Sequence, residues 1–150
     1  MADTCTYIII LNWNGWRDTI ACLESLFQSR NSPFRVIVCD NNSGDGSLFK
    51  IAAWARGEIS AELPQDARLR TLVGSVVRPV EYINLSATAI NSGSFTDKGE
   101  PLVLIDNEEN GGFAAGNNVG LRYALKQPDM SHVWILNNDT LVDPCCLSNM

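Results

Sequence analysis

The chain has 150 residues, the size of one ordinary domain, and its apolar (45%) and charged (19%) contents are typical of globular proteins. This composition supports a sizeable core and argues against global disorder. The formal net charge of −6 argues against a broad nucleic-acid-binding surface, which usually carries a basic excess. An acidic chain that binds a phosphorylated ligand needs a cation, backbone N–H groups or a few local basic residues.

The cysteines favour free thiols in a reducing compartment. There are five, an odd number without a CxxC pattern, and one histidine is too few to complete a zinc site. The N-terminal stretch MADTCTYIIIL lacks the positive charge and the long apolar run of a signal peptide. No stretch approaches the ~20 apolar residues of a membrane span. We therefore expect a cytoplasmic protein without a transmembrane segment.

Four short apolar runs along the chain predict β-strands. They are YIIIL (7–11), VIVC (36–39), LVLI (102–105) and VWIL (133–136). Each run is continuous rather than alternating, which is typical of strands that are covered on both faces. These runs therefore predict the strands of a buried, parallel sheet.

Helical patterns lie between the apolar runs, within residues 16–29, 47–57 and 117–128. The first pattern places Ile20, Leu23 and Phe27 on one side of a helix. The second ends at Gly57 and the third at Pro128, and both residue types commonly terminate helices. The alternation of strand and helix predicts an α/β fold with a mostly parallel sheet flanked by helices.

Residues 58–101 are much longer than an ordinary connection between elements. Within this segment, RTLVGSVVRPVEYINLSATAI (70–90) predicts one or two extra strands, and NSGSFTDKGEP (91–101) has the composition of a loop. We interpret the segment as an insertion at the edge of the sheet rather than as a second domain.

An Asn- and Asp-rich segment follows each predicted strand, at residues 12–15, 40–45, 106–118 and 137–140. Ligands of open parallel sheets bind beyond the carboxyl ends of the strands, where all four segments would meet. Any one of them has the composition of a plain turn. Four at one edge predict a binding site.

Other ligand-binding motifs do not fit. A GxGxxG pattern after the first strand and a P-loop pattern are both absent, which argues against a standard dinucleotide or P-loop site. The stretch DNNSGDGS (40–47) is similar to a calcium-binding loop, but a required position is wrong in either register. Asp45 occupies the glycine position in one, and Ala52 replaces the bidentate glutamate in the other.

Four blocks in order, YIIILNWNGWRDTIACLESL, VIVCDNNSGDGS, ENGGFAAGNNVGLRYAL and VWILNNDTLVDP, resemble a known family. Together they are similar to an inverting, GT-A-type family 2 glycosyltransferase of the rhamnosyltransferase-like branch. The resemblance covers about residues 6–56 and 102–146, whereas 58–101 resembles nothing in the family. It implies a GT-A-like sheet and transfer of a sugar, with inversion, from a nucleoside diphosphate donor to an acceptor hydroxyl.

The resemblance implies that the first two loops bind the nucleotide. Trp13 would stack on the base, and Asn12 would bond the base or the ribose. Asp40 would accept the N–H of uracil or thymine. Two simpler interpretations remain open, because an aromatic such as Trp13 also suits a core position and Asp40 also suits an Asx turn.

In the NNDT stretch, Asp139 matches the last acid of the metal-binding signature of the family, and Asn138, with Asn137, would contact the ribose or diphosphate. A Mg²⁺ or Mn²⁺ ion there would bridge both phosphates and offset the charge on the leaving diphosphate. Because the stretch supplies one carboxylate, we expect weak metal affinity without the ligand phosphates. A solvated turn is the alternative.

The glycine-rich stretch NGGFAAGNN (110–118) leads into the third predicted helix. Its glycines, Gly112 among them, permit tight turns and close approach of a ligand, and Asn117 or Asn118 is expected to cap the helix. Free N–H groups at such a start suit a sugar diphosphate. The complete predicted nucleotide-sugar site consists of Asn12, Trp13, Asn14, Asp40, Asn42, Asn110, Gly112, Asn117 and Asn138.

The family resemblance also implies that the chain lacks part of the enzyme. The general base of the family follows the metal motif, within an acceptor-binding half that we expect to be absent from residues 1–150. The catalytic base is therefore expected beyond Met150, the last residue of the sequence. We expect donor binding without transfer, and we nominate no base from Glu108, Glu109 or Asp143.

Two further features of the sequence are expected to have no part in catalysis. His132 precedes the last predicted strand, at the end away from the site, and is expected to be structural. The adjacent pair Cys145–Cys146 has no base beside it in the sequence, so we expect it to have no chemical role.

The expected partners are a UDP- or dTDP-linked sugar and a glycan or lipid-linked acceptor, without nucleic acid. By analogy, the full protein would act in bacterial polysaccharide or glycolipid assembly, with possible peripheral association at the inner face of the membrane. Two other functions are compatible with the same residues: a non-catalytic nucleotide- or sugar-binding module, and a protein-interaction scaffold that keeps only the fold.

Overall fold

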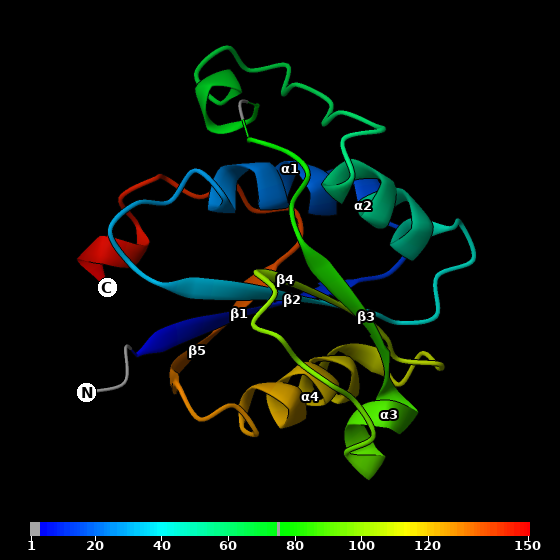
Figure 1. Cartoon of the computed structure of the whole chain (residues 1–150). Helices are drawn as coiled ribbons and strands as arrows, with labels where there is room; N and C mark the ends of the chain where they lie inside the picture. The colour runs from blue at the N-terminus through cyan, green and yellow to red at the C-terminus, as the bar shows by residue number, and fades with distance from the viewer. Residues whose placement is uncertain (1–3, 75) are drawn as a thin grey trace.

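A five-stranded sheet lies between two layers of helices in the computed structural model, which describes residues 4–74 and 76–150 (Figure 1). The strand order is β3-β4-β2-β1-β5, and all four neighbouring pairs are parallel. The strands are β1 (Cys5–Asn12), β2 (Phe34–Asp40), β3 (Tyr82–Ser86), β4 (Leu102–Asp106) and β5 (Met130–Asn137). The predicted α/β class is confirmed, and each apolar run lies in a strand. The parts of the signal-peptide and insertion predictions that fall on residues 1–3 and Ser75 lie outside the described residues.

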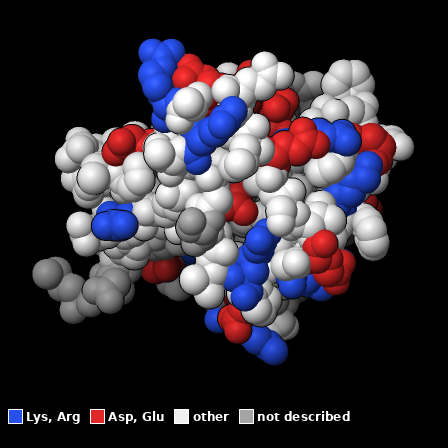
Figure 2. Space-filling view, turned by 90° about the horizontal axis from the view of Figure 1, so that it is seen from above, with Lys and Arg blue, Asp and Glu red and all other residues white. Residues whose placement is uncertain are grey.

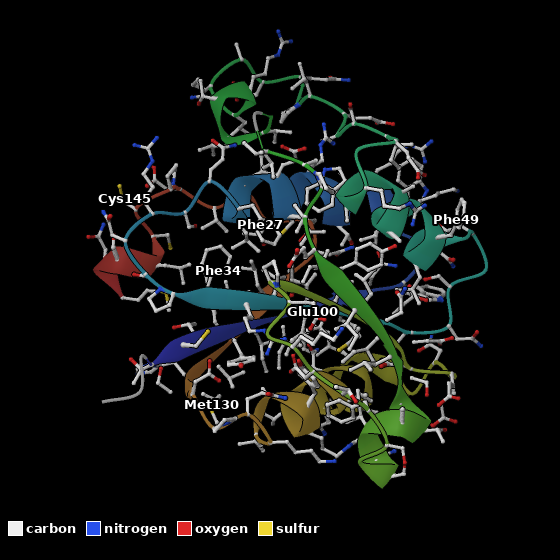
Figure 3. All side chains as sticks on the ribbon, in the orientation of Figure 1. Phe27, Phe34, Phe49, Glu100, Met130 and Cys145 are labelled. Atoms are coloured by element: carbon white, nitrogen blue, oxygen red, sulfur yellow. The ribbon has the colours of Figure 1, made fainter. Side chains whose placement is uncertain are left out.

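The two helix layers bury opposite faces of the sheet. Helices α1 (Trp16–Leu26) and α2 (Ser47–Ala55) cover one face, and α3 (Ala87–Ser92) and α4 (Gly112–Ala124) cover the other (Figure 1). Because successive strand residues point to opposite faces, Ile8 packs under α1 and α2 while Ile9 packs against α4. We call the buried residues between the sheet and α1 and α2, Ile8 among them, the first core cluster; Phe27, after α1, and Phe34, in β2, pack against it with ring centroids 5.7 Å apart (Figure 3).

Helix α4 begins five residues before its expected start, so the prediction that Asn117 or Asn118 caps it is wrong. The residue before the helix is Gly111, and Asn117 lies inside, where its amide donates to the carbonyl oxygen of Phe113 at 2.9 Å. Gly116 is also helical rather than part of a turn. A Cβ there would lie 2.5 Å from Leu11 Cδ1, so glycine allows α4 to pack close to the sheet.

Strand β5 forms one edge of the sheet, where among the described residues it pairs with β1 alone. The expectation that this strand is covered on both faces is wrong at Ile135, which is 49% exposed. Leu136 is buried in the first core cluster. An unbroken apolar run therefore identified a strand but not its position, because an edge strand can carry the same residues as a central one.

The segment 58–101 adds one strand, β3, which pairs with β4 and forms the other edge of the sheet, as the edge-insertion interpretation predicted. The SATAI stretch forms α3 instead of a second strand, and the Ser86 hydroxyl caps it by accepting the Ala89 N–H at 3.1 Å. Buried Glu24 of α1 holds the preceding part of the segment. Its carboxylate accepts the indole N–H of Trp54 at 2.8 Å and the backbone N–H of Gly74 at 3.1 Å.

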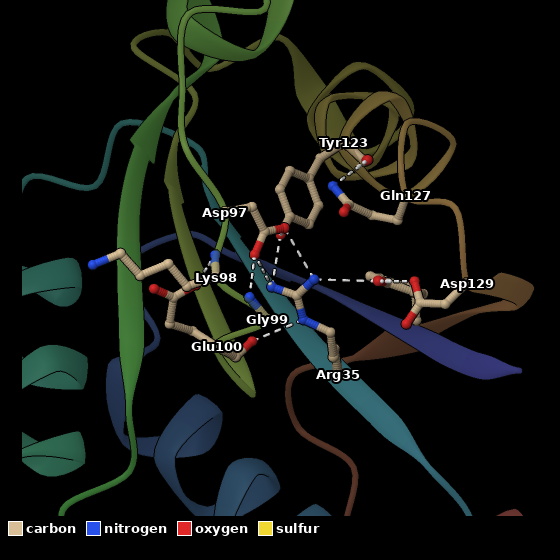
Figure 4. A network of polar contacts seen from close by, with 9 residues as sticks. Arg35, Asp97, Lys98, Gly99, Glu100, Tyr123, Gln127 and Asp129 are labelled. Carbon is tan, nitrogen blue, oxygen red and sulfur yellow. Dashed lines mark hydrogen bonds and ion pairs between the residues drawn. The ribbon is translucent and has the colours of Figure 1, made fainter. Parts of the chain in front are cut away.

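A buried polar network fixes the loop that follows α3 (Figure 4). The Arg35 guanidinium of β2 donates to both carboxylate oxygens of Asp97, at 2.8 and 3.0 Å, and to the hydroxyl of Tyr123 at 2.8 Å. Its Nε donates to the carbonyl oxygen of Glu100 at 2.8 Å. Residues 91–101 were predicted to form a loop, and residues 93–101 do so. Arg35 anchors that loop to the sheet.

Candidate functional site

The predicted site segments lie along one edge of the sheet, which we call the carboxyl rim. The strands are parallel, so their carboxyl ends meet there, and the register pairs Asn12 with Asp40, Asp40 with Asp106, and Leu11 with Asn137. Among the described residues, no helix is both long and apolar enough to cross a membrane.

Asp40 is buried beneath the rim, 4% exposed, and its carboxylate already accepts three hydrogen bonds. Oδ1 accepts the amide of Asn12 at 2.6 Å and the hydroxyl of Ser43 at 2.7 Å, and Oδ2 accepts the backbone N–H of Ser43 at 2.9 Å. A carboxylate offers about four acceptor positions, which leaves one on Oδ2. The Asp40 carboxylate thus stabilises a turn through the N–H three residues on rather than two, which differs from an Asx turn, and it leaves room for a single further donor.

Asn12 is fully buried, and its side chain supports Asp40 rather than facing solvent. Its amide also donates to Ser43 Oγ at 3.3 Å, and its Oδ1 accepts the Thr19 hydroxyl at 2.8 Å. Sequence reasoning missed both Ser43 and Thr19. The position of Ser43, three residues after Asp40, is a spacing typical of side-chain-stabilised turns, whereas the sequence contains no comparable signal for Thr19.

Asn14 and Asn42 are exposed on the rim, and both adopt left-handed backbone conformations, with φ of 50° and 56°. Asparagine tolerates this region better than most residues, so turn geometry alone accounts for its presence at both positions. Asn14 also joins the first two loops, because its Oδ1 accepts the Gly44 N–H at 2.9 Å and its own N–H donates to Ser43 Oγ at 2.8 Å.

Trp13 is 60% exposed, which excludes the core position that the sequence left open. It lines a depression of about 290 Å³, which we call the Trp13 pocket. Phe113, 59% exposed, lines the same pocket and was not identified from the sequence, which placed it in the glycine-rich stretch before the predicted helix. The other lining residues are Leu11, Leu136, Asn137, Asn138 and Asp139.

Asp139 is exposed and lines both the Trp13 pocket and a second depression. That depression, of about 330 Å³, also contains Arg17 and Glu62. Neighbouring Asn138 is held in place, because its amide donates to the Thr19 hydroxyl at 3.2 Å. Within residues 4–74 and 76–150, no three His, Cys, Asp or Glu side chains gather closely enough to hold a metal by themselves. One carboxylate with neutral amides suits Mg²⁺ or Mn²⁺ only when ligand phosphates complete the shell.

The glycine-rich loop is tied to the sheet through Asn41. The Asn41 amide donates to the carbonyl oxygen of Gly112 at 3.1 Å, and Asn110 Oδ1 accepts the Gly112 N–H at 3.0 Å. Gly112 has a φ of +84°, so this position requires glycine. Asn117 is 3% exposed within α4. The rim thus exposes Trp13, Asn14, Asn42, Asn110, Gly112 and Asp139, half-buries Asn138, and buries Asn12, Asp40 and Asn117.

The chain after the rim leads through a short 3-10 helix, η2 (Leu147–Asn149), to Met150. Leu147 is buried in the first core cluster, whereas Met150 is 76% exposed and does not line the Trp13 pocket. A base beyond Met150, as the family resemblance implies, would lie outside the described residues, so its position stays a prediction. The end of the chain therefore adds no group to the site described above.

The thiols and surface charges narrow the chemistry of the site. All five cysteines are free, and burial raises the pKa of the Cys22 thiol to about 12, which leaves it protonated and unreactive. Basic and acidic side chains alternate over the face that carries α1 and α2, without a continuous basic patch (Figure 2). Pairs such as Arg17–Glu62, 2.6 Å apart, account for this alternation.

Comparison with models of protein families finds no match, and comparison with curated protein sequences likewise finds none. A functional assignment for this chain therefore depends on the geometry of the carboxyl rim.

Proposed function

We propose that this chain binds a nucleoside diphosphate-sugar at the carboxyl rim, as the donor-binding part of an inverting, GT-A-type glycosyltransferase. The observation that carries the proposal is the Trp13 pocket. An exposed aromatic ring and an exposed carboxylate, Asp139, line one depression beyond the carboxyl ends of parallel strands. Ligands of open α/β sheets bind at this position.

The aromatic lining supports binding of a nucleotide base. Trp13 and Phe113 present large, exposed ring surfaces, on which a base gains roughly 1–3 kcal/mol by stacking. Asp40 keeps one acceptor position, but it is buried and does not line the Trp13 pocket, so the choice of a UDP- or dTDP-linked donor follows from the family resemblance alone. The pocket volume of about 290 Å³ is below the roughly 300–1,000 Å³ typical of pockets for whole drug-sized ligands. The base would occupy the pocket, and the diphosphate would extend along the rim.

Asp139 is the residue that would hold a Mg²⁺ or Mn²⁺ ion, with the ligand phosphates as further donors. When bound, the ion would offset the charge that develops on the leaving nucleoside diphosphate. Asn137 and Asn138 flank this position, and the bond from Asn138 to Thr19 fixes an amide that would lie beside the phosphates of a bound donor. Arg17, 58% exposed in the adjoining depression, lies near the same position, where Glu62 balances its charge at 2.6 Å.

In the proposed reaction, the acceptor hydroxyl attacks the anomeric carbon as the bond to the diphosphate breaks, and the configuration inverts. A general base takes the hydroxyl proton. We assign this base to no residue within 4–74 or 76–150. Glu108, for example, accepts the backbone N–H and hydroxyl of Thr88 at 2.8 and 2.7 Å. The proposed role of the chain is to bind and orient the donor; a glycan or lipid-linked acceptor and a cytoplasmic site at the membrane face belong to the proposal for the full protein.

Calorimetric titration with UDP and dTDP, with and without Mn²⁺, tests the proposal. We expect binding that requires Mn²⁺ and that Asp139→Ala removes, whereas Asp143→Ala, an exposed acid in the next loop, leaves it unchanged. Metal-independent binding would instead support a non-catalytic nucleotide-binding module. If neither UDP nor dTDP binds, the proposal is contradicted, and the remaining interpretation is a scaffold that keeps only the fold.

A further inference from the structure

A second pocket, of about 230 Å³, lies between α3 and α4; we call it the α3–α4 pocket. It shares no residue with the Trp13 pocket and none with the predicted nucleotide-sugar site. Its lining consists of the strand-end residues Asn41 and Asn107 together with residues of α3, of α4 and of the loop before α4.

The topology of the sheet places an opening at this position. The helix that follows β2, α2, covers one face of the sheet, and the helix that follows the neighbouring strand β4, α4, covers the other (Figure 1). The connections therefore diverge at the carboxyl ends of β2 and β4, where open α/β sheets form ligand crevices. Asn41 and Asn107 directly follow these two strands.

The floor of the pocket contains a buried acceptor that lacks a partner. Asn41 is 2% exposed and Asn107 is 5% exposed. The Asn107 amide donates to Asn41 Oδ1 at 2.7 Å and to the carbonyl oxygen of Gly116 at 3.3 Å. Among the described residues, nothing donates to Asn107 Oδ1. Such an unsatisfied oxygen costs about 1–3 kcal/mol; because Oδ1 is itself shielded from solvent, a ligand hydroxyl would recover that energy only if the Asn107 side chain turned toward the pocket.

The mouth of the pocket contains a basic side chain, an acidic side chain and side-chain amides. Arg122 and Glu109 both line it, so a ligand with a net charge gains little over a neutral one. The Nε of Arg122 donates to Asn91 Oδ1 at 2.9 Å, which joins α4 to α3. Asn118, also at the mouth, can both donate and accept, as the hydroxyl groups of a ligand do.

Size and lining exclude larger and aromatic ligands. The volume of about 230 Å³ is smaller than pockets that enclose drug-sized molecules, which begin near roughly 300 Å³. Within the described part of the chain, no aromatic side chain lines the pocket, so a nucleobase would lack a stacking partner. We infer that the α3–α4 pocket binds a small, uncharged, hydroxyl-rich molecule of the size of one sugar ring. This inference does not depend on the function proposed for the Trp13 pocket.

NMR titration of the ¹⁵N-labelled chain tests the inference, with D-glucose, D-galactose, L-rhamnose and myo-inositol as probes and inorganic phosphate and glycine as charged comparisons. We expect at least one of the four polyols to cause saturable shifts in the side-chain amide signals of Asn41, Asn107 and Asn118. Absence of saturable shifts with all four would overturn the inference. So would shifts caused by phosphate or glycine but by none of the polyols.

A pair of variants on α4 localises the binding. Ala115 lines the pocket and Ala114 does not, and both are exposed, so Ala115→Leu fills the pocket while Ala114→Leu adds the same side chain outside it. We expect Ala115→Leu to weaken polyol binding about tenfold or more. Ala114→Leu and Asp139→Ala should leave it unchanged. Equal binding by the Ala115 and Ala114 variants, or shifts confined to Trp13 and its neighbours, would contradict the assignment to this pocket.

Discussion

The side-chain amide of Asn12 donates a hydrogen bond to the carboxylate of Asp40 at 2.6 Å, across the carboxyl ends of two paired strands. Both residues are buried. The Ser43 hydroxyl donates to the same carboxylate, and its oxygen accepts the backbone N–H of Asn14 in the first loop. One buried carboxylate thus holds together the first two loops of the carboxyl rim.

Replacement of this carboxylate should destabilise the fold. The Asp40→Asn variant replaces one carboxylate oxygen with an amide nitrogen. That nitrogen is itself a donor, and it would face the donors of Ser43 or the amide of Asn12. Hydrogen bonds to charged groups contribute about 1.5–3 kcal/mol, so we expect a loss of about 2 kcal/mol in the free energy of unfolding, measured by urea denaturation. The control is Asp106→Asn, the exposed register neighbour, which should change that free energy by less than about 0.5 kcal/mol. Equal losses in both variants would contradict the role of Asp40.

Gly116 should resist substitution because α4 packs closely against the sheet there. In Gly116→Ala, the new Cβ would lie 2.4 Å from Asn41 Oδ1 and 2.5 Å from Leu11 Cδ1. Forced overpacking typically costs about 1–3 kcal/mol, so we expect a clear drop in the thermal midpoint. Gly44→Ala is the matched control, because a Cβ there meets nothing within 4 Å. An unchanged midpoint for Gly116→Ala would show that the helix can shift freely away from the sheet.

The Arg35–Asp97 pair should give the chain a measurable stability change in acid. Burial by itself raises the pKa of the Asp97 carboxyl, but hydrogen bonds from Arg35 and Tyr123 outweigh it and lower the pKa from 3.8 to about 2. A carboxyl with a lowered pKa stabilises the fold fully above 3.8, and that stability is lost as the pH falls through about 2. The difference in pKa corresponds to about 2 kcal/mol.

We therefore expect Asp97→Asn to lower the free energy of unfolding by about 3 kcal/mol near neutral pH, because the variant leaves a buried guanidinium without its counter-ion. The difference in the free energy of unfolding between the unmodified chain and Asp97→Asn should decrease by about 2 kcal/mol as the pH is lowered from about 4 to about 2. Asp66→Asn, which breaks an exposed pair with Arg68, should change nothing measurable. If the difference in the free energy of unfolding between the two chains stays constant with pH, the lowered pKa of Asp97 is contradicted.

Glu24 should be one attachment of the segment 58–74 to the helices, beside Gln28, whose amide donates to the carbonyl oxygens of Leu72 and Gly74 at 2.8 and 3.0 Å. Glu24→Gln keeps the volume but places an amide against the donors of Trp54 and Gly74. Each unsatisfied buried donor costs about 1–3 kcal/mol, so we expect a loss of about 2–3 kcal/mol and a shift in tryptophan emission. Glu62→Gln, at an exposed pair with Arg17, serves as the control and should have little effect. Similar losses from both substitutions would contradict a special role for Glu24.

The sequence was sufficient to predict the fold class, because continuous apolar runs separated by helical patterns leave few arrangements other than a parallel sheet. It was insufficient to place β5 at an edge, since VWIL has the composition of a central strand while Ile135 is half exposed. It also misplaced the start of α4. Asparagine suits a helix cap, but Asn117 instead bonds the Phe113 carbonyl inside the helix, and that choice depends on tertiary packing.

The candidate site could be located from the sequence more readily than its residues could be assigned. Parallel strands bring their carboxyl ends together, so the Asn- and Asp-rich loops had to share one edge. Whether a polar residue in such a loop faces a ligand or supports a neighbour depends on burial. Asn12 is fully buried and Trp13, beside it, is 60% exposed. Phe113 was not identified from the sequence, because the helix that contains it was predicted to begin five residues after its observed start.

Paramagnetic broadening by Mn²⁺ tests the central claim most directly: a cation binds at Asp139 with the phosphates of the nucleotide as its other ligands. With UDP or dTDP present, low Mn²⁺ concentrations should broaden the backbone amide signals of residues 137–140 first. Without a nucleotide, or in Asp139→Ala, that broadening should disappear. Broadening centred on another part of the chain, or broadening at residues 137–140 that is the same with and without nucleotide, would contradict the account.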